Sequence, residues 1–503
     1  MSLVWTLMIL FFGGVAAWIG SLFHDRAPRS IALVSVVASI LPLALDLVSA
    51  APDPEASRWL VSMNAQWIPS LGVQFSLGLD GLSLLLVVLT AFLGVIAVAA
   101  AWDEIVERAG FFYFNLLWTL AGVVGVFTAI DLFLFFFFWE VMLIPMYFII
   151  AIWGHENKRY AATKFFLFTQ ASGMLLLLAL LVLVYFFRVQ HGYLSFAYED
   201  LLLVRMNPAI EMWVMLGFFI GFATKLPSVP LHTWLPDAHS QAPTAGSVLL
   251  AGVLLKTGAY GLIRFTLPLF PNASAAFTPV ALALAVLSIL YCAKVALAQS
   301  DLKRLIAYTS VSHMGFVLLG VYAWNLLGLQ GAVMTMLAHG LSAAALFSLA
   351  GGLQRRLHTR DIGSMGGFWQ PAPRMAIVAL FFSVAALGMP GLGNFIGEFL
   401  SLLGAFSVSV SATVLAALGM IFASIYSLWV MQVVFQGGYA NASGPASGAA
   451  LPDLGRRELA VYGLMMLGLI AMGFFPNAFL GVSEAALERL LDLSRLSPLW
   501  GIE

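Results

Sequence analysis

The sequence predicts an all-α polytopic membrane protein with about 14 transmembrane helices. Hydrophobic residues make up 62% of its 503 residues and charged residues only 9%, whereas soluble proteins carry about 25% charged residues. Apolar runs of about twenty residues, long enough to cross a bilayer as helices, recur along the whole chain. Two long apolar stretches are interrupted by proline and glycine. We therefore expect one transmembrane domain over residues 1–503 and no soluble domain.

A hydropathy window of about twenty residues gives the expected positions of the spans. They are 3–20, 31–50, 79–101, 112–130, 131–152, 161–187, 209–226, 241–264, 275–298, 303–322, 327–350, 374–405, 408–435 and 458–475. The segments 51–78 and 436–455 are expected to be irregular connectors. Helical spacing of apolar residues after Pro476 predicts a C-terminal segment, 476–503, along the surface.

Composition and motifs exclude several classes of protein. The net charge of −1 gives no reason to expect a nucleic acid as partner. Cys292 is the single cysteine, so an internal disulfide and a self-contained cysteine-ligated iron–sulfur cluster are excluded. The chain has no phosphate-binding glycine loop and no zinc-binding pattern. We therefore expect no cofactor or metal bound by this chain. The first twenty residues lack a basic start and are predicted to be a retained span.

The distribution of Lys and Arg predicts the orientation. Of 23 such residues, 14 fall in loops that follow odd-numbered spans, including Lys303, and 6 in even-numbered loops or at the C-terminus, including Arg264. Because basic loops stay in the cytoplasm, both termini are expected on the periplasmic side.

The stretch from Gly217 to Gly261 carries the strongest functional signal. Lys225 ends one apolar helix and Lys256 lies deep in the next, while His232 and His239 lie in the proline-rich joint between them. A lysine within a span is unfavourable unless it is compensated, and broken backbone at membrane depth is tolerated only where protein or water covers it. The sequence therefore predicts a functional site here.

Glu140 is the expected partner of Lys225. It lies nine residues after Asp131, about 14 Å along a helix, which places it near the middle of the bilayer. Burial favours the neutral forms of both groups, and their mutual attraction favours the charged forms. The pair can therefore switch proton affinity. The alternatives are a neutral, hydrogen-bonded glutamic acid and a static buried ion pair.

His313, His339 and Glu398 are further ionisable residues within spans. Imidazole is suited to passing protons near neutral pH, but a histidine inside a span can also be a hydrogen-bonding core residue. Haem ligation by the two histidines is disfavoured because each span holds only one. Asp80 and Asp131 stand at the starts of spans, where a helix-capping role is as good an explanation as a functional one.

A fixed offset hints at internal duplication. Lys225 and Glu398 are 173 residues apart, as are Glu140 and His313. The segment Gly-Phe-Phe-Ile-Gly precedes Lys225, and Gly-Asn-Phe-Ile-Gly precedes Glu398. Corresponding broken helices in two halves are typical of transport pathways. Chance can also produce matching offsets.

The motifs WEVMLIPMYF, GHENKRYAATKFFLFTQASG and KLPSVPLHTWLPDAHSQAPTAGSVLLAGVLLKTGAYG resemble the antiporter-like subunits of respiratory complex I, the proton-pumping NADH:quinone oxidoreductase. The resemblance covers nearly the whole chain, and the second motif and Glu398 most resemble the M-type branch. The superfamily also contains subunits of Mrp-type Na⁺/H⁺ antiporters and of membrane-bound hydrogenases, which remain the alternative.

The resemblance implies two inverted five-helix repeats, approximately 112–264 and 275–435, in which spans seven and twelve are broken. It also implies a proton relay from the Glu140–Lys225 ion pair through Lys256, His313 and His339 to Glu398. His232, His239 and Asp80 are secondary candidates.

The resemblance further implies that the chain works in a bacterial inner membrane beside other complex I subunits, with two further antiporter-like subunits flanking it. NADH, FMN, iron–sulfur clusters and quinone are expected in partner subunits, and this chain is expected to move protons and to contact lipid.

Overall fold

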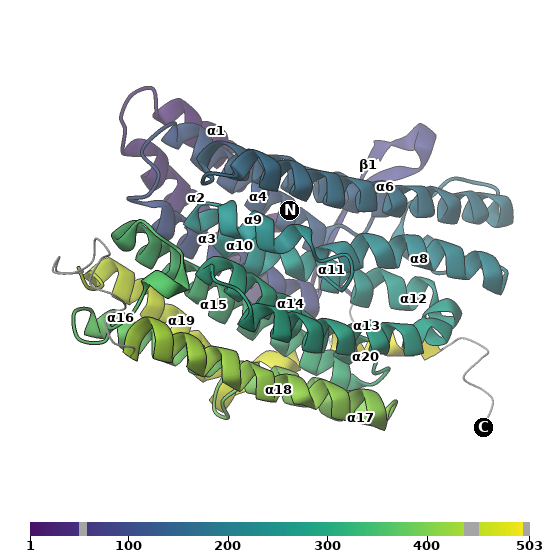
Figure 1. The fold of residues 1–503 in the computed structure, drawn as a ribbon. Coiled ribbons are helices and arrows are strands. Elements are labelled where there is room, and N and C mark those ends of the chain that lie inside the picture. Colours follow the sequence, from purple (N-terminus) through teal and green to yellow (C-terminus); the bar gives the residue numbers. More distant parts are fainter. Residues whose placement is uncertain (50–57, 437–451, 496–503) are drawn as a thin grey trace.

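A computed structural model describes residues 1–49, 58–436 and 452–495. Its helices run roughly side by side, with α6 along one edge of the bundle and α17 and α18 along the other (Figure 1). Within the described residues, 12 helices are long and apolar enough to cross a membrane. This confirms an all-α polytopic membrane protein.

The helices of the first half are α1 (Ser2–Gly20), α2 (Ala27–Ser49), α3 (Gly81–Ala101), α4 (Ala109–Thr128), α5 (Leu132–Trp153), α6 (Lys158–His191), α7 (Tyr198–Leu201), α8 (Pro208–Lys225), α9 (Trp234–Gln241), α10 (Thr244–Leu249), η2 (Leu250–Leu254), α11 (Leu255–Gly261), η3 (Leu262–Thr266) and α12 (Leu267–Leu269). Those of the second half are α13 (Pro271–Leu297), α14 (Leu302–Val321), α15 (Leu326–Leu357), η4 (Ile362–Ser364), α16 (Pro373–Ala386), α17 (Gly393–Phe406), α18 (Val410–Val430), η5 (Met431–Gln436), α19 (Arg456–Phe474) and α20 (Asn477–Arg495).

Short polar side chains fix the starts of several spans. The Asp80 carboxylate accepts a hydrogen bond from the Ser83 backbone N–H, and Asp131, Asp301 and Asn325 cap α5, α14 and α15 in the same way. Such caps satisfy amide groups that a helix cannot pair internally. Asp80 and Asp131 therefore both cap helices, which is one of the two explanations that the sequence left open for them.

The first predicted break lies between α8 and α10. Helix α8 ends at Lys225, and the short helix α9 bridges the proline-rich joint before α10 begins at Thr244. From α10 to α12 the helix is continuous but contains two π-helical turns, η2 and η3. Such turns are rare and often mark functional sites.

The second predicted break separates α16 from α17. Gly388 and Gly391 there have φ values of +81° and +94°, a backbone region that glycine enters without steric strain. Helices α8, α16 and α17 are not among the 12 long spans, so the expected total of about 14 stays a prediction.

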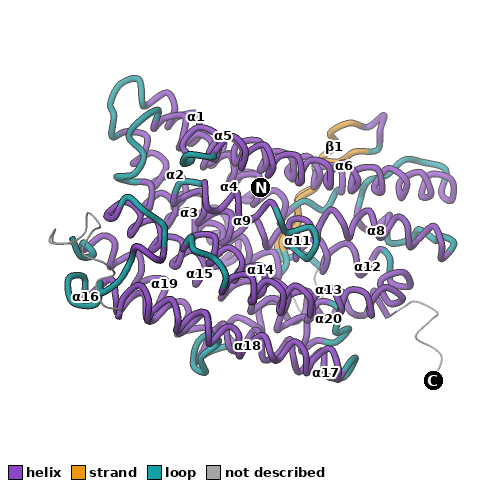
Figure 2. Tube along the Cα trace, viewed as in Figure 1, coloured by secondary structure: helices purple, strands orange, loops and turns teal. Residues whose placement is uncertain are grey.

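The predicted connector at 51–78 is wrong over its second half. Strands β1 (Val61–Ile68) and β2 (Val73–Leu79) form an antiparallel hairpin (Figure 2). The tip between them turns at Gly72, which has φ +69°. The segment alternates exposed and partly buried residues along β1, a two-residue period that a membrane-helix window does not detect. Most of the other expected connector, 436–455, lies outside the described residues.

The expected surface helix after Pro476 forms as α20, but it is not merely superficial. It packs along α3, α12 and α15 and buries Leu487, Leu490 and Leu491. The residues that follow Arg495 lie outside the described ranges.

The helix from α10 to α12 lies at the centre of the bundle. Every residue in its apolar window is buried, and α3, α8 and α15 pack against it. Helices α14 and α15 are nearly as enclosed, and α15 packs closely on the broken helix α17. Lys256, His313 and His339, which these helices carry, are therefore buried inside the protein.

Candidate functional site

Lys256 is held at the centre of the bundle by the π-helical turn that precedes it. Its side chain is fully buried, and its Nζ donates to the backbone carbonyl of Ala251 at 2.6 Å. Because a π-helical turn shifts the backbone pairing, the Ala251 carbonyl is available to the ammonium group. The irregular turn thus gives a buried lysine a partner that a regular α-helix would not offer.

His339 is the second partner of Lys256. The Lys256 Nζ and the His339 Nδ1 are 2.9 Å apart, so α11 and α15 are joined by a direct hydrogen bond between titratable groups. The His339 Nε2 is buried without a hydrogen-bond partner. The ring of His313, on α14, lies 5.6 Å from that of His339, centroid to centroid.

His313 bonds Glu398 directly. The His313 Nδ1 lies 2.6 Å from the Glu398 Oε1, and both side chains are buried. The second ring nitrogen, Nε2, is 3.1 Å from the Tyr426 hydroxyl of α18. The structure therefore brings Lys256, His339, His313 and Glu398 together, as the family resemblance implied, and adds Tyr426.

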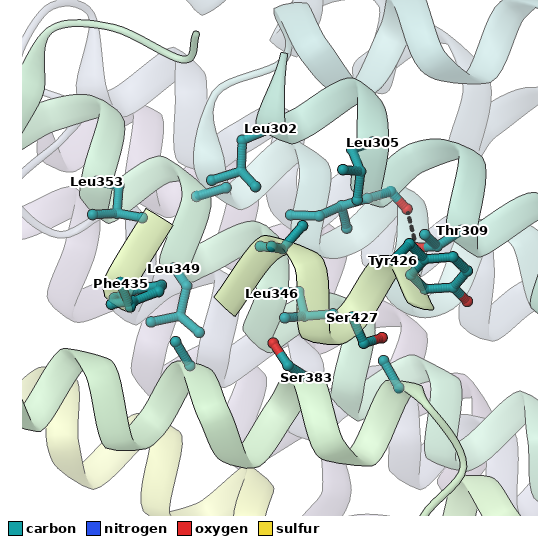
Figure 3. A pocket seen from close by; sticks show the side chains of 15 residues that line it. Leu302, Leu305, Thr309, Leu346, Leu349, Leu353, Ser383, Tyr426, Ser427 and Phe435 are labelled. Atoms are coloured by element: carbon teal, nitrogen blue, oxygen red, sulfur yellow. Dashed lines mark hydrogen bonds between the residues drawn. The ribbon is translucent and has the colours of Figure 1, made fainter. Parts of the chain in front are cut away.

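Sequence reasoning missed Tyr426 because a tyrosine in an apolar helix is common and its hydroxyl suits membrane interfaces as well as cores. Its place on α18, the helix that follows the broken pair α16 and α17, was the only available signal. It also lines a small apolar cavity of about 40 Å³ between α14, α15, α16 and α18. Figure 3 shows its lining residues extending from Leu353 and Phe435 to Tyr426, with Ser383 in the middle and Ser427 near the tyrosine.

Glu140 and Lys225 do not form the expected direct ion pair. The Lys225 Nζ is buried without a hydrogen-bond partner and lies 5.4 Å from the Trp139 ring centroid and 5.5 Å from that of Phe165. A cation over aromatic faces is stabilised by their quadrupoles. The charges of Glu140 and Lys225 still interact, but the ammonium group is bracketed by rings, not by a carboxylate.

The Glu140 carboxyl group faces α6. Gln170 hydrogen-bonds it, and its Oε1, which has no partner, lies against Gly173, where an added Cβ would be only 3.1 Å away. Helix α6 can approach this closely because position 173 has no side chain. Only part of the hydrogen-bonding capacity of the Glu140 carboxyl group is thus used.

The two histidines of the joint have different surroundings. His239 is fully buried, both its ring nitrogens lack hydrogen-bond partners, and its ring stacks on Phe347 at 4.4 Å. Positive charge on Lys256 or Lys303 repels a protonated His239 ring. His232 lies near the rings of Tyr291 and Tyr308 and is not joined to the central group by any hydrogen bond among the described residues.

Asp80 forms a separate buried ion pair with Arg264 of η3. The Arg264 guanidinium also lies 5.3 Å from the Trp59 ring centroid and 5.4 Å from that of Tyr260. The sequence assigned Arg264 to a loop, which is wrong, because the span continues to Leu269. A hydropathy window truncates a helix at a charge, whereas here the carboxylate and two rings compensate it.

The central residues can accept and donate protons but offer no place for a metal. In the described part of the chain, no three His, Cys, Asp or Glu side chains are grouped so that they could hold a metal ion. The arrangement instead alternates lysine, histidine and carboxylate inside a protein-covered interior. Such groups can exchange protons over hydrogen-bond distances.

Comparison with known proteins gives the family. The profile of the family described as "NADH:quinone oxidoreductase/Mrp antiporter, TM" matches residues 129–424. NADH-quinone oxidoreductase subunit M of Escherichia coli K12 is 51% identical over 500 residues, which cover 97% of each chain. The chain belongs to the family of NADH-quinone oxidoreductase subunit M.

Solved structures support the same membership. A chain of respiratory complex I from Thermus thermophilus with bound NADH matches with a TM-score of 0.87 and 33% identity, covering 98% of this chain and 100% of that one. A chain of the Mrp complex from Dietzia sp. DQ12-45-1b has a TM-score of 0.82 but 19% identity, and only 55% of it is covered. That second likeness shows a shared fold alone.

The family match contains most of the candidate site. Glu140, Lys225, Lys256, His313, His339 and Glu398 all fall within residues 129–424. Asp80 lies before the matched region, and Tyr426 lies two residues after it. The residues of the central hydrogen-bonded group thus lie in the part of the chain that matches the NADH:quinone oxidoreductase/Mrp antiporter family, apart from this tyrosine.

Proposed function

We propose that this chain is a proton-translocating membrane subunit of an NADH:quinone oxidoreductase and that it has no redox centre of its own. The observation that carries the proposal is the buried group Lys256–His339–His313–Glu398, in which two direct hydrogen bonds join titratable side chains. Ionisable residues inside a membrane are unfavourable and seldom kept without function. Four of them in one enclosed group favour a relay over a structural role.

Protons would pass along this group in short steps. The Lys256 ammonium can donate a proton to the His339 Nδ1, 2.9 Å away. The gap between His339 and His313 is too long for a direct bond, but one water molecule can bridge such a distance. The His339 Nε2 and the Glu398 Oε2 are buried without partners, so both are free to bond such water.

Glu140 and Lys225 would act as the switch. Their charges attract each other without a direct bond, so the strength of that attraction depends on small changes in their separation. When electron transfer elsewhere in the complex perturbs the pair, the proton affinity of Lys225 would change and the proton would move toward Lys256. His239, whose two ring nitrogens are buried without hydrogen-bond partners, is a secondary candidate for the relay.

Two inverted five-helix repeats, approximately 112–264 and 275–435, give this relay its two halves. The offset of 173 residues relates Glu140 to His313 and Lys225 to Glu398. Each half therefore holds one acid–base pair. Glu140 and Lys225 interact through their charges in the first half, and His313 and Glu398 share a 2.6 Å hydrogen bond in the second. This correspondence supports duplication beyond a coincidence of numbering.

The relatives' names support the setting in which the relay would work. We place the chain in a bacterial inner membrane, with both termini in the periplasm, among other complex I membrane subunits and flanked by two further antiporter-like subunits. NADH, FMN, iron–sulfur clusters and quinone would be bound by partner subunits. An Mrp-type antiporter or a membrane-bound hydrogenase subunit is the second candidate, and the shared fold with the Mrp complex is its support.

Replacement of Glu140 by Gln tests the proposal. The amide keeps the size and hydrogen bonding of the carboxyl group but can neither ionise nor attract Lys225. We expect an assembled complex whose NADH-driven acidification of inside-out vesicles, and whose coupled quinone reductase activity, fall at least ~10-fold, because a positioned proton-transfer group contributes about 10²-fold or more.

The matched control is Glu488→Gln, because Glu488 is exposed on α20. It should pump like the wild type. Wild-type pumping by an assembled Glu140→Gln complex would contradict the relay.

A further inference from the structure

Tyr426 reaches the buried acid–base pair of the second half from a helix that is mostly exposed. Only 33% of the apolar window of α18 is buried. The buried residues of α18, which the structure describes in full, are Thr413, Ala416, Gly419, Ala423, Tyr426 and Ser427. All of them except Tyr426 are small. Helix α18 therefore contributes one long polar side chain to the interior of the protein.

Both ring nitrogens of His313 have a hydrogen-bond partner. The Nδ1 lies 2.6 Å from the Glu398 Oε1, and the Nε2 lies 3.1 Å from the Tyr426 hydroxyl. All three side chains are buried. A neutral imidazole has one N–H donor and one acceptor nitrogen, and the bond made at one nitrogen decides where the proton lies. The tyrosine at Nε2 therefore influences what Nδ1 offers to Glu398.

The surroundings of the Tyr426 hydroxyl favour donation to His313. Within the described residues, the His313 Nε2 is the hydrogen-bond partner of this hydroxyl, and there is no second acceptor. Figure 3 shows the hydroxyl at the end of the ring that points away from Leu349 and Phe435, and the cavity beside the ring is mainly apolar. An O–H group turned away from Nε2 would be buried without an acceptor, which is destabilising. The hydroxyl therefore donates to Nε2, and the His313 proton lies on Nδ1.

The same arrangement leaves one carboxylate oxygen of Glu398 open. Its Oε1 accepts from the His313 Nδ1–H, whereas its Oε2 is buried without a hydrogen-bond partner. The Oε2 faces Gly388 at the break before α17, where an added Cβ would lie 3.4 Å from it. The carboxylate is therefore held at one oxygen and can accept a proton at the other.

We infer that Tyr426 is a positioning residue that keeps the His313 proton on Nδ1, so that His313 holds the Glu398 carboxylate by Oε1 and the relay proton reaches Glu398 at Oε2. His313 then does not itself carry the proton, because protonation of Nε2 would leave the tyrosine hydroxyl without an acceptor. One proton is added to Oε2, and Oε1 keeps its bond to Nδ1–H. The inference rests on the proposed function, because it assigns roles within the same relay.

Removal of the hydroxyl tests the positioning role. Tyr426→Phe keeps the ring but leaves Nε2 without a donor, so that the His313 proton is no longer confined to Nδ1. We expect NADH–quinone reductase turnover of the assembled complex to fall about five-fold, the change that corresponds to the loss of one hydrogen bond of about 1 kcal/mol. The solvent deuterium isotope effect on turnover should rise, because protonation of Glu398 then limits the rate. Wild-type turnover, or a loss with an unchanged isotope effect, would overturn the inference.

The matched control is Tyr322→Phe. Tyr322 follows α14, its side chain is fully buried, and its hydroxyl has no hydrogen-bond partner in the described residues. The substitution therefore removes the same atom from a buried site without breaking a hydrogen bond. This variant should match the wild type in both turnover and isotope effect.

A double variant shows whether Tyr426 acts through His313. Tyr426→Phe combined with His313→Ala should turn over no more slowly than His313→Ala alone, since the tyrosine then has no ring to position. A further loss in the double variant would mean that the tyrosine has an independent role, which contradicts the inference.

Asparagine at position 313 separates a residue that holds Glu398 from one that carries the proton. His313→Asn keeps an amide N–H donor near the place of Nδ1 but cannot take up a proton. We expect it to turn over faster than His313→Ala. Equal losses in the two variants would make His313 a proton carrier and the inference wrong.

Glu140→Gln distinguishes a failure of this inference from a failure of the relay. If Tyr426→Phe turns over normally while Glu140→Gln fails, Tyr426 does not position His313 and the relay stands. If both variants turn over normally, the relay itself is wrong.

Discussion

At the scale of single residues, the groups around Lys225 decide how strongly its positive charge is stabilised. The Trp139 and Phe165 rings bracket its ammonium group, and the Glu140 carboxylate is not in contact. Aromatic faces stabilise a cation more weakly than a direct carboxylate bond in a buried site. A lysine held in this way keeps its charge without being locked into it, which suits a residue that has to give up a proton.

Substitution of Lys225 tests this reading. Arginine stacks well on aromatic rings and keeps the charge, but it cannot release a proton, whereas alanine removes both. We expect Lys225→Arg to assemble normally and to pump almost as poorly as Lys225→Ala, measured as NADH-driven acidification of vesicles. A purely electrostatic role predicts the opposite, with the arginine variant pumping close to the wild-type rate.

At the scale of elements, the broken helices place the functional residues. The gap between α16 and α17 turns at Gly388 and Gly391, and Glu398 follows within two turns of α17. An added Cβ at Gly391 would meet only Phe474, at 3.7 Å. The requirement at this position is therefore conformational, since φ near +94° is unfavourable for any residue with a Cβ.

Gly391→Ala should therefore destabilise the break, by about 1–2 kcal/mol for an unfavourable φ. We expect the temperature of half-inactivation of the purified complex to fall by a few degrees. Gly463→Ala is the matched control, because Gly463 lies within α19 with open space around its Cβ position, where alanine is the better helix former. An unchanged temperature for Gly391→Ala would mean that the break relaxes to another conformation.

At the scale of the whole molecule, the enclosed centre separates two polar ends. One end holds a polar cavity at His155 and Arg360, and the other holds the hairpin β1–β2 and the buried Asp80–Arg264 pair. Between them, every residue in the apolar window of the Lys256 helix is covered by protein. A proton that crosses the chain therefore has to pass through side chains and water inside the bundle.

Thiol labelling tests the predicted orientation. Cys292 is buried, so single cysteines introduced at exposed positions report on their own side of the membrane. We expect a membrane-impermeant maleimide to label Ala298→Cys, between α13 and α14, in inside-out vesicles, and Val408→Cys, between α17 and α18, in spheroplasts. The reverse pattern would invert the assigned topology.

Tertiary structure was needed wherever a polar residue is compensated by a distant partner. Tyr426 gave no signal by itself, because only the fold brings its hydroxyl to His313, 113 positions earlier in the chain. Lys303 and Arg264 were assigned to loops because a charge usually ends a span. Both are buried, and each has a partner from a distant part of the chain, the Ala242 carbonyl for Lys303 and the Asp80 carboxylate for Arg264. The absence of a direct Glu140–Lys225 bond also depends on packing, because the Lys225 ammonium lies near the Trp139 and Phe165 rings and has no hydrogen-bond partner.

The sequence by itself determined the membrane class and the two breaks, and it singled out Lys256, His313, His339 and Glu398 as ionisable residues within spans. These features depend on local composition: apolar length, proline and glycine positions, and the rarity of ionisable residues within spans. Only the tertiary structure decided which of these residues touch, because hydrogen bonds between helices depend on packing over distances that no local pattern encodes. The hairpin at 61–79 belongs to this second group, since its strands are paired with each other and not with lipid.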